Sequence, residues 1–282
     1  MYEKLIHLHT WEGAPTPRCT RGFVLLGAKP VAVSSYFDRR LPPPDREALL
    51  ASIVEASKHQ AESDVPVLVF DLDGTLLDNR PRGARIFHEM ADAWRPARPA
   101  LAARLATAQA DAIVYGLHEN LRLLGVDDDA LLEEGFTFWK DRFFTDAYMK
   151  YDVAVPGARD FVSACYGAGA TIVYLTGRDL PNMALGTFAS LRDQGFPIGV
   201  VGTSLVTKPA FDIPDTVFKQ DVAPSLSRHG RVVGIFDNEP ANCNLLLEHH
   251  DHAFCVFLDT HHAPNPPALD ARARVIDSFE RE

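Results

Sequence analysis

The sequence predicts an α/β fold, in which a doubly wound, Rossmann-like parallel sheet carries an inserted all-α domain and an N-terminal extension. Strand-like apolar runs alternate with helix-like segments over the second half of the chain, which is typical of a parallel sheet with helices on both faces. Residues 80–152 interrupt this alternation with helix-like segments rich in Ala, Leu, Arg and Glu. These observations divide the chain into an extension (1–64), a core (65–79 and 153–282) and a helical insertion (80–152).

Composition and charge argue against several classes of protein. The chain has 282 residues and a formal net charge of −10, which disfavours a general nucleic-acid binder and a protein that adheres to anionic membranes. No apolar run reaches the length of about 18 residues that a membrane span needs, and the first residues lack a signal-like apolar core. The four cysteines are scattered and form no C-x-x-C pair, as expected of reduced thiols in a cytoplasmic protein. The oligomeric state stays open.

The N-terminal extension combines strand-like and helix-like segments. Strands are predicted for KLIHLHTW and RGFVLLGAKPVAVSSYF, which are rich in β-branched and aromatic residues. A helix is predicted for LPPPDREALLASIVEASKHQ, because Leu49, Ile53 and Ala56 follow a helical spacing. We expect the extension to pack on the core and to add strands to its sheet.

The core and the insertion follow in order. The first core strand is VLVF (67–70), and the insertion after it contains the helix-like pieces RIFHEMADAW, ALAARLATAQADAIVYGLHENLRLLG and DDALLEEGFTFWKDRFF. From Val155 on, helices are predicted for PGARDFVSACYGAG, PNMALGTFASLRDQGF, TVFKQDVAPSLSRHG, ANCNLLLEHH and the tail ARARVIDSFERE. Strands are predicted between them for ATIVYLT, PIGVVGTSLV, RVVGIFD and AFCVFLD.

Polar side chains stand where three of the predicted strands end. VLVF ends in Asp71, IVYL ends in Thr176, and GIF ends in Asp237. Ligands of parallel sheets bind outside the carboxyl ends of the strands. If the three strands are neighbours, these residues converge on one binding site.

These residues belong to four short motifs, DLDGT (71–75), LTGR (175–178), FK (218–219) and FDNEPAN (236–242). In this order and spacing, the motifs resemble those of the haloacid dehalogenase superfamily over about residues 65–260. The resemblance implies a phosphohydrolase in which Asp71 is the nucleophile and Asp73 is the general acid and base. It also implies that Thr176 and Lys219 hold the phosphoryl group.

Elementary chemistry supports these roles. Cleavage of a phosphomonoester needs a nucleophile, a proton donor and cations around the phosphoryl group. Asp71 and Asp73 point the same way on an extended chain, and Gly74 allows a sharp turn beside the phosphate. Mg²⁺ prefers carboxylate, water and phosphate oxygens. Its predicted ligands are the Asp71 and Asp237 carboxylates and the Asp73 backbone carbonyl, with Asn238 holding a metal-bound water.

Two assignments have a nearby alternative. Lys208 in LVTKP competes with Lys219 for the lysine role, and we prefer Lys219 because it opens a predicted helix nearer Asp237. Asn238 stands where the family often has a second acid. Glu239 is a possible substitute, although its side chain should point elsewhere on an extended chain.

The insertion resembles the helical cap of small-molecule phosphatases in the superfamily, which closes over the site and selects the leaving group. The predicted substrate-binding residues are Gly74, Thr75, Gly177, Arg178 and Arg82. Arg178 is either a surface arginine or a fork to a substrate phosphate or a site acid. Arg82, with Arg80 and Arg85, follows the first motif, and these arginines either bind a second anionic group of the substrate or form a solvated basic turn.

The sequence therefore predicts Mg²⁺-dependent hydrolysis of a small phosphorylated metabolite through a phospho-aspartate. One alternative is phosphoryl transfer, as in the phosphomutases of the superfamily. Another is a nucleic-acid 3′-phosphatase, because the C-terminal motifs are also similar to the phosphatase domain of polynucleotide kinase 3′-phosphatases; the acidic charge and the insertion argue against it. The third is a non-catalytic binding protein on the same scaffold.

Overall fold

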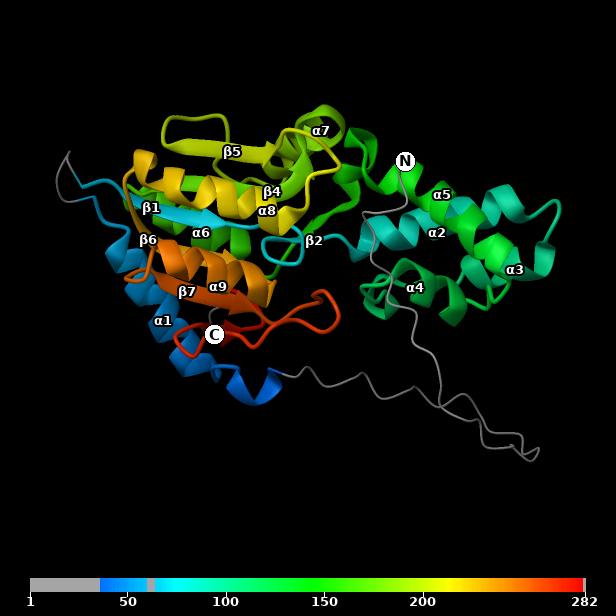
Figure 1. Cartoon of the computed structure of the whole chain (residues 1–282), viewed down its shortest axis with the longest axis horizontal. Helices are drawn as coiled ribbons and strands as arrows, with labels where there is room; N and C mark the ends of the chain where they lie inside the picture. The colour runs from blue at the N-terminus through cyan, green and yellow to red at the C-terminus, as the bar shows by residue number, and fades with distance from the viewer. Residues whose placement is uncertain (1–35, 60–63, 281–282) are drawn as a thin grey trace.

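A six-stranded sheet forms the centre of the computed structural model, which describes residues 36–59 and 64–280 (Figure 1). The strand order is β5-β4-β1-β6-β7-β8, and every pair of neighbours is parallel. The strands are β1 (Pro66–Phe70), β4 (Thr171–Asp179), β5 (Thr203–Lys208), β6 (Arg231–Asp237), β7 (Phe254–Leu258) and β8 (Arg274–Ile276). The predicted α/β fold class is confirmed.

Strand β1 lies in the middle of the sheet because its sequence, PVLVF, is apolar throughout. All its residues are buried, as expected of a strand that helices cover on both faces. It pairs with β4 on one side and with β6 on the other. The chain winds outward from β1 in both directions, so the residue after β1 lies at a topological switch point, where α/β sheets bind ligands.

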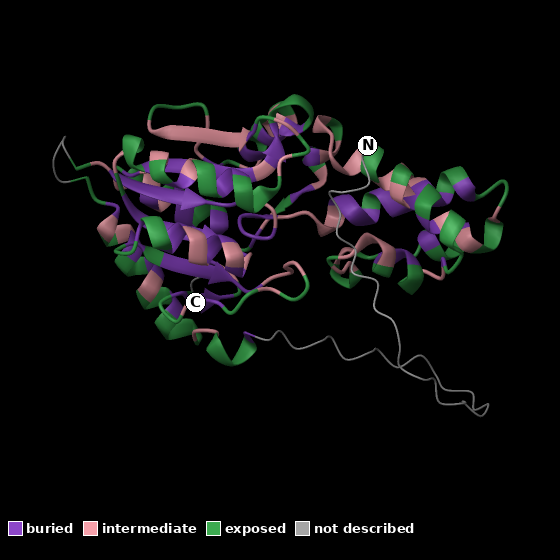
Figure 2. Cartoon of the chain, viewed as in Figure 1, coloured by how far each residue is buried: buried purple, intermediate pink, exposed green. Residues whose placement is uncertain are grey.

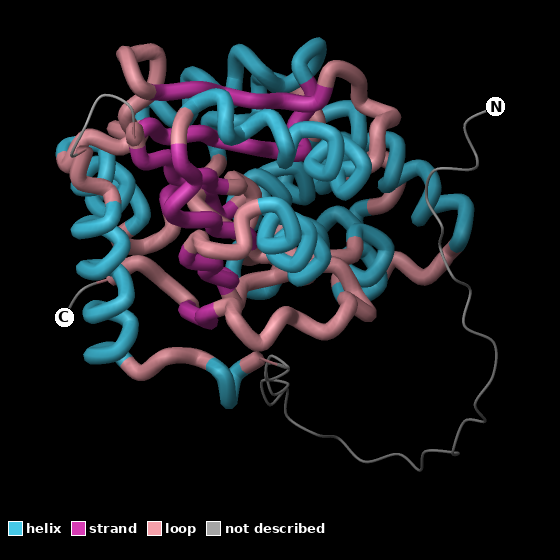
Figure 3. The backbone as a smooth tube through the Cα atoms, turned by 60° about the vertical axis from the view of Figure 1, so that its left-hand side comes forward, coloured by secondary structure: helices cyan, strands magenta, loops and turns pink. Residues whose placement is uncertain are grey.

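Helices cover both faces of the sheet (Figures 2 and 3). They are α1 (Pro43–Ala56), α6 (Ala158–Gly167), α7 (Leu180–Asp193), α8 (Asp215–Val222) and α9 (Pro240–His249). Ile53 of α1 and Phe161 of α6 share one apolar cluster with Phe70 of β1. Phe218 of α8 and Leu246 of α9 belong to a second cluster, on Val69 and its neighbours. Since consecutive residues of a strand face opposite sides, β1 contributes to both clusters.

The helical insertion leaves the core at β2 (Leu77–Asp78) and returns at β3 (Val153–Ala154), and these two segments pair antiparallel. It contains α2 (Arg80–Trp94), α3 (Pro99–Leu105), η2 (Ala110–Ala112), α4 (Leu117–Leu123), α5 (Asp129–Phe143) and η3 (Asp146–Tyr151). A cluster around Met90, Trp94 and Leu121 gives it an apolar core of its own. Figure 1 shows the insertion beyond the carboxyl ends of the strands, where a cap would lie.

One end of the insertion packs tightly on the core. Gly186 of α7 donates its N–H to Asp146 Oδ1 of η3 at 2.6 Å. A Cβ atom at Gly186 would lie only 2.3 Å from the Asp146 carbonyl oxygen. Glycine is therefore required for η3 to approach α7 this closely.

Two sequence predictions concern the ends of the chain. The N-terminal strands lie almost entirely within residues 1–35, outside the described residues. The tail ARARVIDSFERE was predicted to be helical, and this is wrong, because β8 (Arg274–Ile276) adds to the edge of the sheet beside β7. Ala and Arg favour helices, but the unpaired backbone groups of β7 offer hydrogen bonds to an extended segment. Among the described helices, none combines the length and apolar character that crossing a membrane requires.

Candidate active site

The three strand-end residues meet at the carboxyl edge of the sheet. Asp71 follows β1 and donates its backbone N–H to the carbonyl oxygen of Phe236 in β6 at 2.9 Å. Asp237 ends β6, and Thr176 lies near the end of β4. Because β1 lies between β4 and β6, the three side chains share one site, as the sequence predicts.

Lys219 joins two of these carboxylates. Its Nζ donates to Asp71 Oδ1 at 2.8 Å and to Asp237 Oδ2 at 2.7 Å, and its side chain is only 2% exposed. Burial raises the pKa of Asp71 to about 7, although the Lys219 charge acts against this. Burial disfavours the charge of Lys219, but Asp237 and Asp71 raise its pKa above the ordinary value. The lysine is therefore a fixed cation beside the proposed nucleophile.

Lys208 lies elsewhere. Its Nζ donates to Asp215 Oδ1 at 2.8 Å and to the carbonyl oxygen of Ile213 at 2.9 Å. It holds the loop before α8, whereas Lys219 reaches Asp71. Of the two lysines that the sequence left in competition, the structure places Lys219 at the site.

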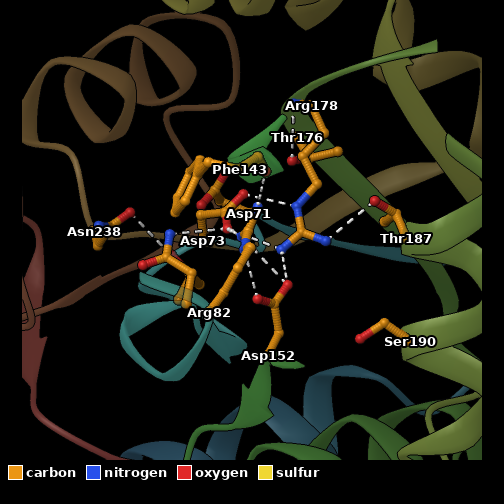
Figure 4. Close-up of polar contacts among 12 residues, drawn as sticks. Asp71, Asp73, Arg82, Phe143, Asp152, Thr176, Arg178, Thr187, Ser190 and Asn238 are labelled. Atoms are coloured by element: carbon orange, nitrogen blue, oxygen red, sulfur yellow. Dashed lines mark hydrogen bonds and ion pairs between the residues drawn. The ribbon is translucent and has the colours of Figure 1, made fainter. Parts of the chain in front are cut away.

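Asp73 is held by two arginines (Figure 4) and by Asn79. Arg178 Nε and Nη2 donate to its two carboxylate oxygens, each at 2.8 Å. Arg82 Nη2 donates to Oδ1 at 2.7 Å, and Asn79 Nδ2 donates to the same oxygen at 3.0 Å. Burial works to raise the pKa of Asp73, but Arg178 and Arg82 hold it well below the usual range. In this state Asp73 is a carboxylate.

Asp152 completes this arrangement. Arg82 Nε donates to Asp152 Oδ1 at 2.8 Å, and Arg178 Nη2 donates to Asp152 Oδ2 at 2.6 Å. Arg82 also donates to the carbonyl oxygen of Phe143 at 2.9 Å, and its guanidinium lies 4.0 Å from the centre of the Phe143 ring. Arg178 donates in addition to Thr187 Oγ1 at 3.1 Å.

Both arginines are buried among their partners. The side chain of Arg82 is 0% exposed and that of Arg178 is 1% exposed. The guanidinium of Arg82 is enclosed by Asp73, Asp152 and Phe143, and its contact with a substrate stays a prediction. For Arg178, the structure shows the fork to a site acid that the sequence offered as one possibility.

The turn after Asp73 brings Gly74 and Thr75 against Asn238. Gly74 has a φ of +80°, and a Cβ atom there would lie 2.3 Å from Asn238 Nδ2. Thr75 is fully buried and donates from Oγ1 to Asn238 Oδ1 at 3.3 Å, while Asn238 Nδ2 donates to the carbonyl oxygen of His261 at 2.7 Å. The three residues therefore fasten the loops of the site to one another. The metal role of Asn238 and the substrate role of Thr75 stay predictions.

Thr176 and Gly177 are close to the same loops. Thr176 is fully buried, and its Oγ1 accepts the N–H of Arg178 at 3.2 Å. A Cβ atom at Gly177 would lie 2.0 Å from Asp215 Oδ2, so glycine lets the start of α8 approach β4. Their contacts with a phosphoryl group stay predictions.

Comparison with known proteins gives the family. The family model described as "haloacid dehalogenase-like hydrolase" matches residues 65–233. The chain belongs to this family. No curated protein sequence matches the chain.

Solved structures resemble this haloacid dehalogenase-like hydrolase at low identity. CbbY from Rhodobacter sphaeroides, in complex with phosphate, is 16% identical, with a TM-score of 0.44 over 77% of this chain and 95% of that one. The class C acid phosphatase from Bacillus anthracis with tungstate bound is also 16% identical, with a TM-score of 0.41 over 70% of this chain and 60% of that one. At these values neither structure bears on what this hydrolase acts upon.

The donor set of the hydrolase suits Mg²⁺. Within the described residues, no three or more His, Cys, Asp or Glu side chains gather as a metal site. Mg²⁺ needs fewer protein ligands, since it is commonly bound by one or two carboxylates together with waters and substrate phosphate oxygens. Asp71 and Asp237 supply two carboxylates, and the N–H of Glu239 and Asn242 Nδ2 hold Asp237 Oδ1 at 2.8 and 3.2 Å. Glu239 itself turns its carboxylate to the N–H of Ala263, as expected.

Sequence reasoning missed Asp152, Asn79 and Asn242. Asn242 lies in the FDNEPAN motif, close in sequence to Asp237, so its amide could have been proposed as a hydrogen-bond partner of that carboxylate. Asn79 follows the first motif by a few residues. Asp152 lies 70 residues from Arg82, in a segment without a recognisable pattern, so only the return of the insertion to the core brings them together.

Proposed function

We propose that this hydrolase cleaves the phosphate ester of a small metabolite through a phospho-aspartate on Asp71, with Mg²⁺ as cofactor. The observation that carries the proposal is the pairing of Asp71 and Asp237 through Lys219 at the topological switch point. A buried carboxylate beside a fixed cation at this edge of the sheet suits a nucleophile that receives a phosphoryl group.

The first half of the reaction forms the phospho-aspartate. A carboxylate oxygen of Asp71 attacks phosphorus, the ester P–O bond breaks, and the leaving oxygen takes a proton. Lys219 and the Thr176 hydroxyl stabilise the charge on the transferring phosphoryl oxygens. Mg²⁺ held by Asp71, Asp237 and the Asp73 carbonyl would neutralise phosphoryl charge when bound. Asp73 is the proton donor: it takes up that proton from solvent on Oδ2, which accepts one hydrogen bond where Oδ1 accepts three, so the arginines still orient it.

The second half releases phosphate. A water molecule attacks phosphorus, its proton goes to Asp73, and the bond between phosphorus and Asp71 breaks. The carboxylate form of Asp73 described above suits this base role. Inorganic phosphate leaves, and the Asp71 carboxylate is restored.

The insertion supports a small-molecule substrate. A cavity of about 430 Å³ opens between α5 of the insertion and the core, and its size is that of a small-ligand site. Phe144 and Phe211 line it, with ring centres 5.0 Å apart, and Lys140 Nζ lies 5.4 Å from the Phe211 ring centre. We propose that the insertion acts as a cap over the site.

The test is phosphate release from 4-nitrophenyl phosphate, and then from a panel of phosphorylated metabolites, with Mg²⁺ and with EDTA. Wild type should turn over only with Mg²⁺, and Asp71→Asn should lose activity by a factor of at least about 10³. Measuring phosphate and alcohol together separates hydrolysis from transfer, because transfer releases the alcohol without free phosphate. Equal activity of wild type and Asp71→Asn would overturn the mechanism.

A further inference from the structure

Asp152 stands at the boundary of the insertion and the core. It lies between η3 (Asp146–Tyr151) and β3 (Val153–Ala154), where the chain returns to the sheet. Its side chain is 0% exposed, and its oxygens accept from Arg82 Nε and Arg178 Nη2. Arg82 is in the first turn of α2, whereas Arg178 belongs to core strand β4. One buried carboxylate therefore joins both ends of the insertion to the core.

The two arginines connect Asp152 to Asp73. Each donates to both carboxylates, so that two cations and two anions alternate in a closed ring (Figure 4). Buried charges are stable only when they are paired in this manner. Removing either carboxylate leaves two adjacent guanidinium groups with half of their counter-charge.

The ring presents only one of its members to the active site. The side chain of Asp73 is 30% exposed, whereas those of Arg82, Arg178 and Asp152 are 0%, 1% and 0% exposed. The three buried members form a rigid support, and the orientation of Asp73 depends on all of them, because Arg planes hold carboxylates in fixed geometry.

We propose that Asp152 is a positioning residue, which acts through Arg82 and Arg178 to orient Asp73. The orientation of Asp73 then depends on how the insertion packs on the core, because Asp152 lies where the insertion returns to the sheet. This proposal rests on the proposed function, because it assigns Asp73 the acid and base steps. It adds a residue outside the four motifs, on the segment that connects the insertion to the sheet.

The test compares two esters. 4-Nitrophenyl phosphate has a leaving group that departs readily as an anion, whereas phenyl phosphate depends more on a proton donor. Asp152→Asn should lower kcat more than it raises KM, and its loss should be larger on phenyl phosphate by about tenfold or more. Asp73→Asn should show the same signature, since both variants disturb the same proton transfer.

Matched controls separate positioning from general damage. Asp259→Asn removes another fully buried carboxylate that pairs with an arginine, Arg40 Nε at 2.5 Å. Arg82→Lys keeps the charge but loses the planar fork that donates from Nε and Nη2 in fixed directions, and Arg98→Lys makes the same change at a partly exposed pair with Glu134. Asp259→Asn and Arg98→Lys should leave the ratio of the two esters unchanged, and Arg82→Lys should shift it as Asp152→Asn does. Arg82→Lys also decides the question if Asp152→Asn does not fold.

A second readout does not depend on turnover. Urea unfolding of Asp73→Asn, Asp152→Asn and the double variant should give non-additive shifts of the midpoint, because both carboxylates neutralise the same two arginines. Additive shifts would overturn the proposal, and so would an unchanged ester ratio in Asp152→Asn and Arg82→Lys. If wild type cleaves neither ester, the proposed function fails on these probes and the unfolding cycle alone decides whether Asp152 and Asp73 are coupled.

Discussion

Replacing Lys219 with methionine tests the electrostatics of the site without any knowledge of the substrate. The lysine Nζ lies 2.8 Å from Asp71 Oδ1 and 2.7 Å from Asp237 Oδ2, so the two oxygens are at most 5.5 Å apart, the sum of these distances. The side chains of Asp71 and Asp237 are only 9% and 1% exposed. Methionine keeps the volume and the apolar stem, but it leaves the two carboxylates without the ammonium between them.

The expected cost follows from this geometry. Two unit charges at that separation repel by about 3 kcal/mol at an effective dielectric constant of about 20. Breaking a buried ion pair by removing one partner costs about 3–5 kcal/mol in measured cases. Lys219→Met should therefore lower the free energy of unfolding by about 3–5 kcal/mol near pH 8 in EDTA.

The loss of stability in Lys219→Met should depend on pH. Burial raises the pKa of Asp71 to about 7 in the folded protein, above its value in the unfolded chain. A group with a raised folded pKa contributes stability at low pH and loses that contribution as the pH rises through the folded pKa. Without Lys219 the pKa of Asp71 rises further, and protonation removes the repulsion. The difference between wild type and variant should therefore be smaller near pH 5.5 than near pH 8.

Urea unfolding followed by circular dichroism measures both effects, and Lys208→Met is the matched control. Lys208 is also buried, but its partner Asp215 is 57% exposed and can be rehydrated when the lysine is lost. Lys208→Met removes this ion pair and two hydrogen bonds to carbonyl oxygens, and it should lower the free energy of unfolding by about 1–2 kcal/mol with little pH dependence. A Lys219→Met loss no larger than that of Lys208→Met, or equal at both pH values, would refute the reasoning.

Two further predictions concern the contact of the insertion with the core and acid stability. Gly186→Ala should lower the free energy of unfolding, measured in urea, by about 1–3 kcal/mol, because its Cβ would meet the Asp146 backbone. Gly167→Ala is the control, since the space around Gly167 is open, and it should be neutral or stabilise the protein by up to about 1 kcal/mol. Equal effects of the two substitutions would contradict the tight packing of η3 on α7. The pKa of Asp73 is lowered in the folded state, against the effect of burial, so its contribution to stability is present above the unfolded pKa and is lost as the pH falls. The stability difference between wild type and Asp73→Asn should therefore narrow below about pH 4 in chemical unfolding, and a constant difference would contradict the lowered pKa.

The sequence predicts the parts of the site that lie at strand ends. Asp71, Thr176 and Asp237 each follow an apolar run, and a parallel sheet brings the ends of neighbouring strands together. Lys219 was found from its spacing before Asp237, although Lys208 remained in competition until the structure showed which ammonium reaches Asp71. Local pattern and sheet topology are enough for these residues, because each sits at a fixed place in a regular element.

The arginine ring could not be predicted in this manner. The fork of Arg178 to a site acid was one of the possibilities that the sequence offered, and both residues belong to neighbouring strand ends, but Arg82 and Asp152 are 70 residues apart. The contact of Arg82 with Asp152 depends on how the insertion returns through β3, which no local pattern encodes. The same limit explains the misread tail, since β8 becomes a strand only because β7 is there to pair with it.

The balance of charge in the site gives a final argument for a divalent cation. Four carboxylates and three cations lie there in two hydrogen-bonded groups, and their net charge is −1 when all are ionised: Asp71, Asp237 and Lys219 in one group, and Asp73, Asp152, Arg82 and Arg178 in the other. A phosphate dianion would bring the total to −3, which is unfavourable in a poorly hydrated site. Adding Mg²⁺ returns the total to −1, the value before the anion enters.

This balance predicts that anion binding and Mg²⁺ binding are coupled. Isothermal titration calorimetry with inorganic phosphate should show binding with Mg²⁺ present and a loss of affinity of at least about tenfold in EDTA. Asp237→Asn should lose most of this dependence on Mg²⁺, because it removes one of the two carboxylates proposed as ligands. Phosphate that binds equally well with and without Mg²⁺ would mean that Lys219 and the helix and loop N–H groups neutralise the anion by themselves, and the proposed role of the metal would fall.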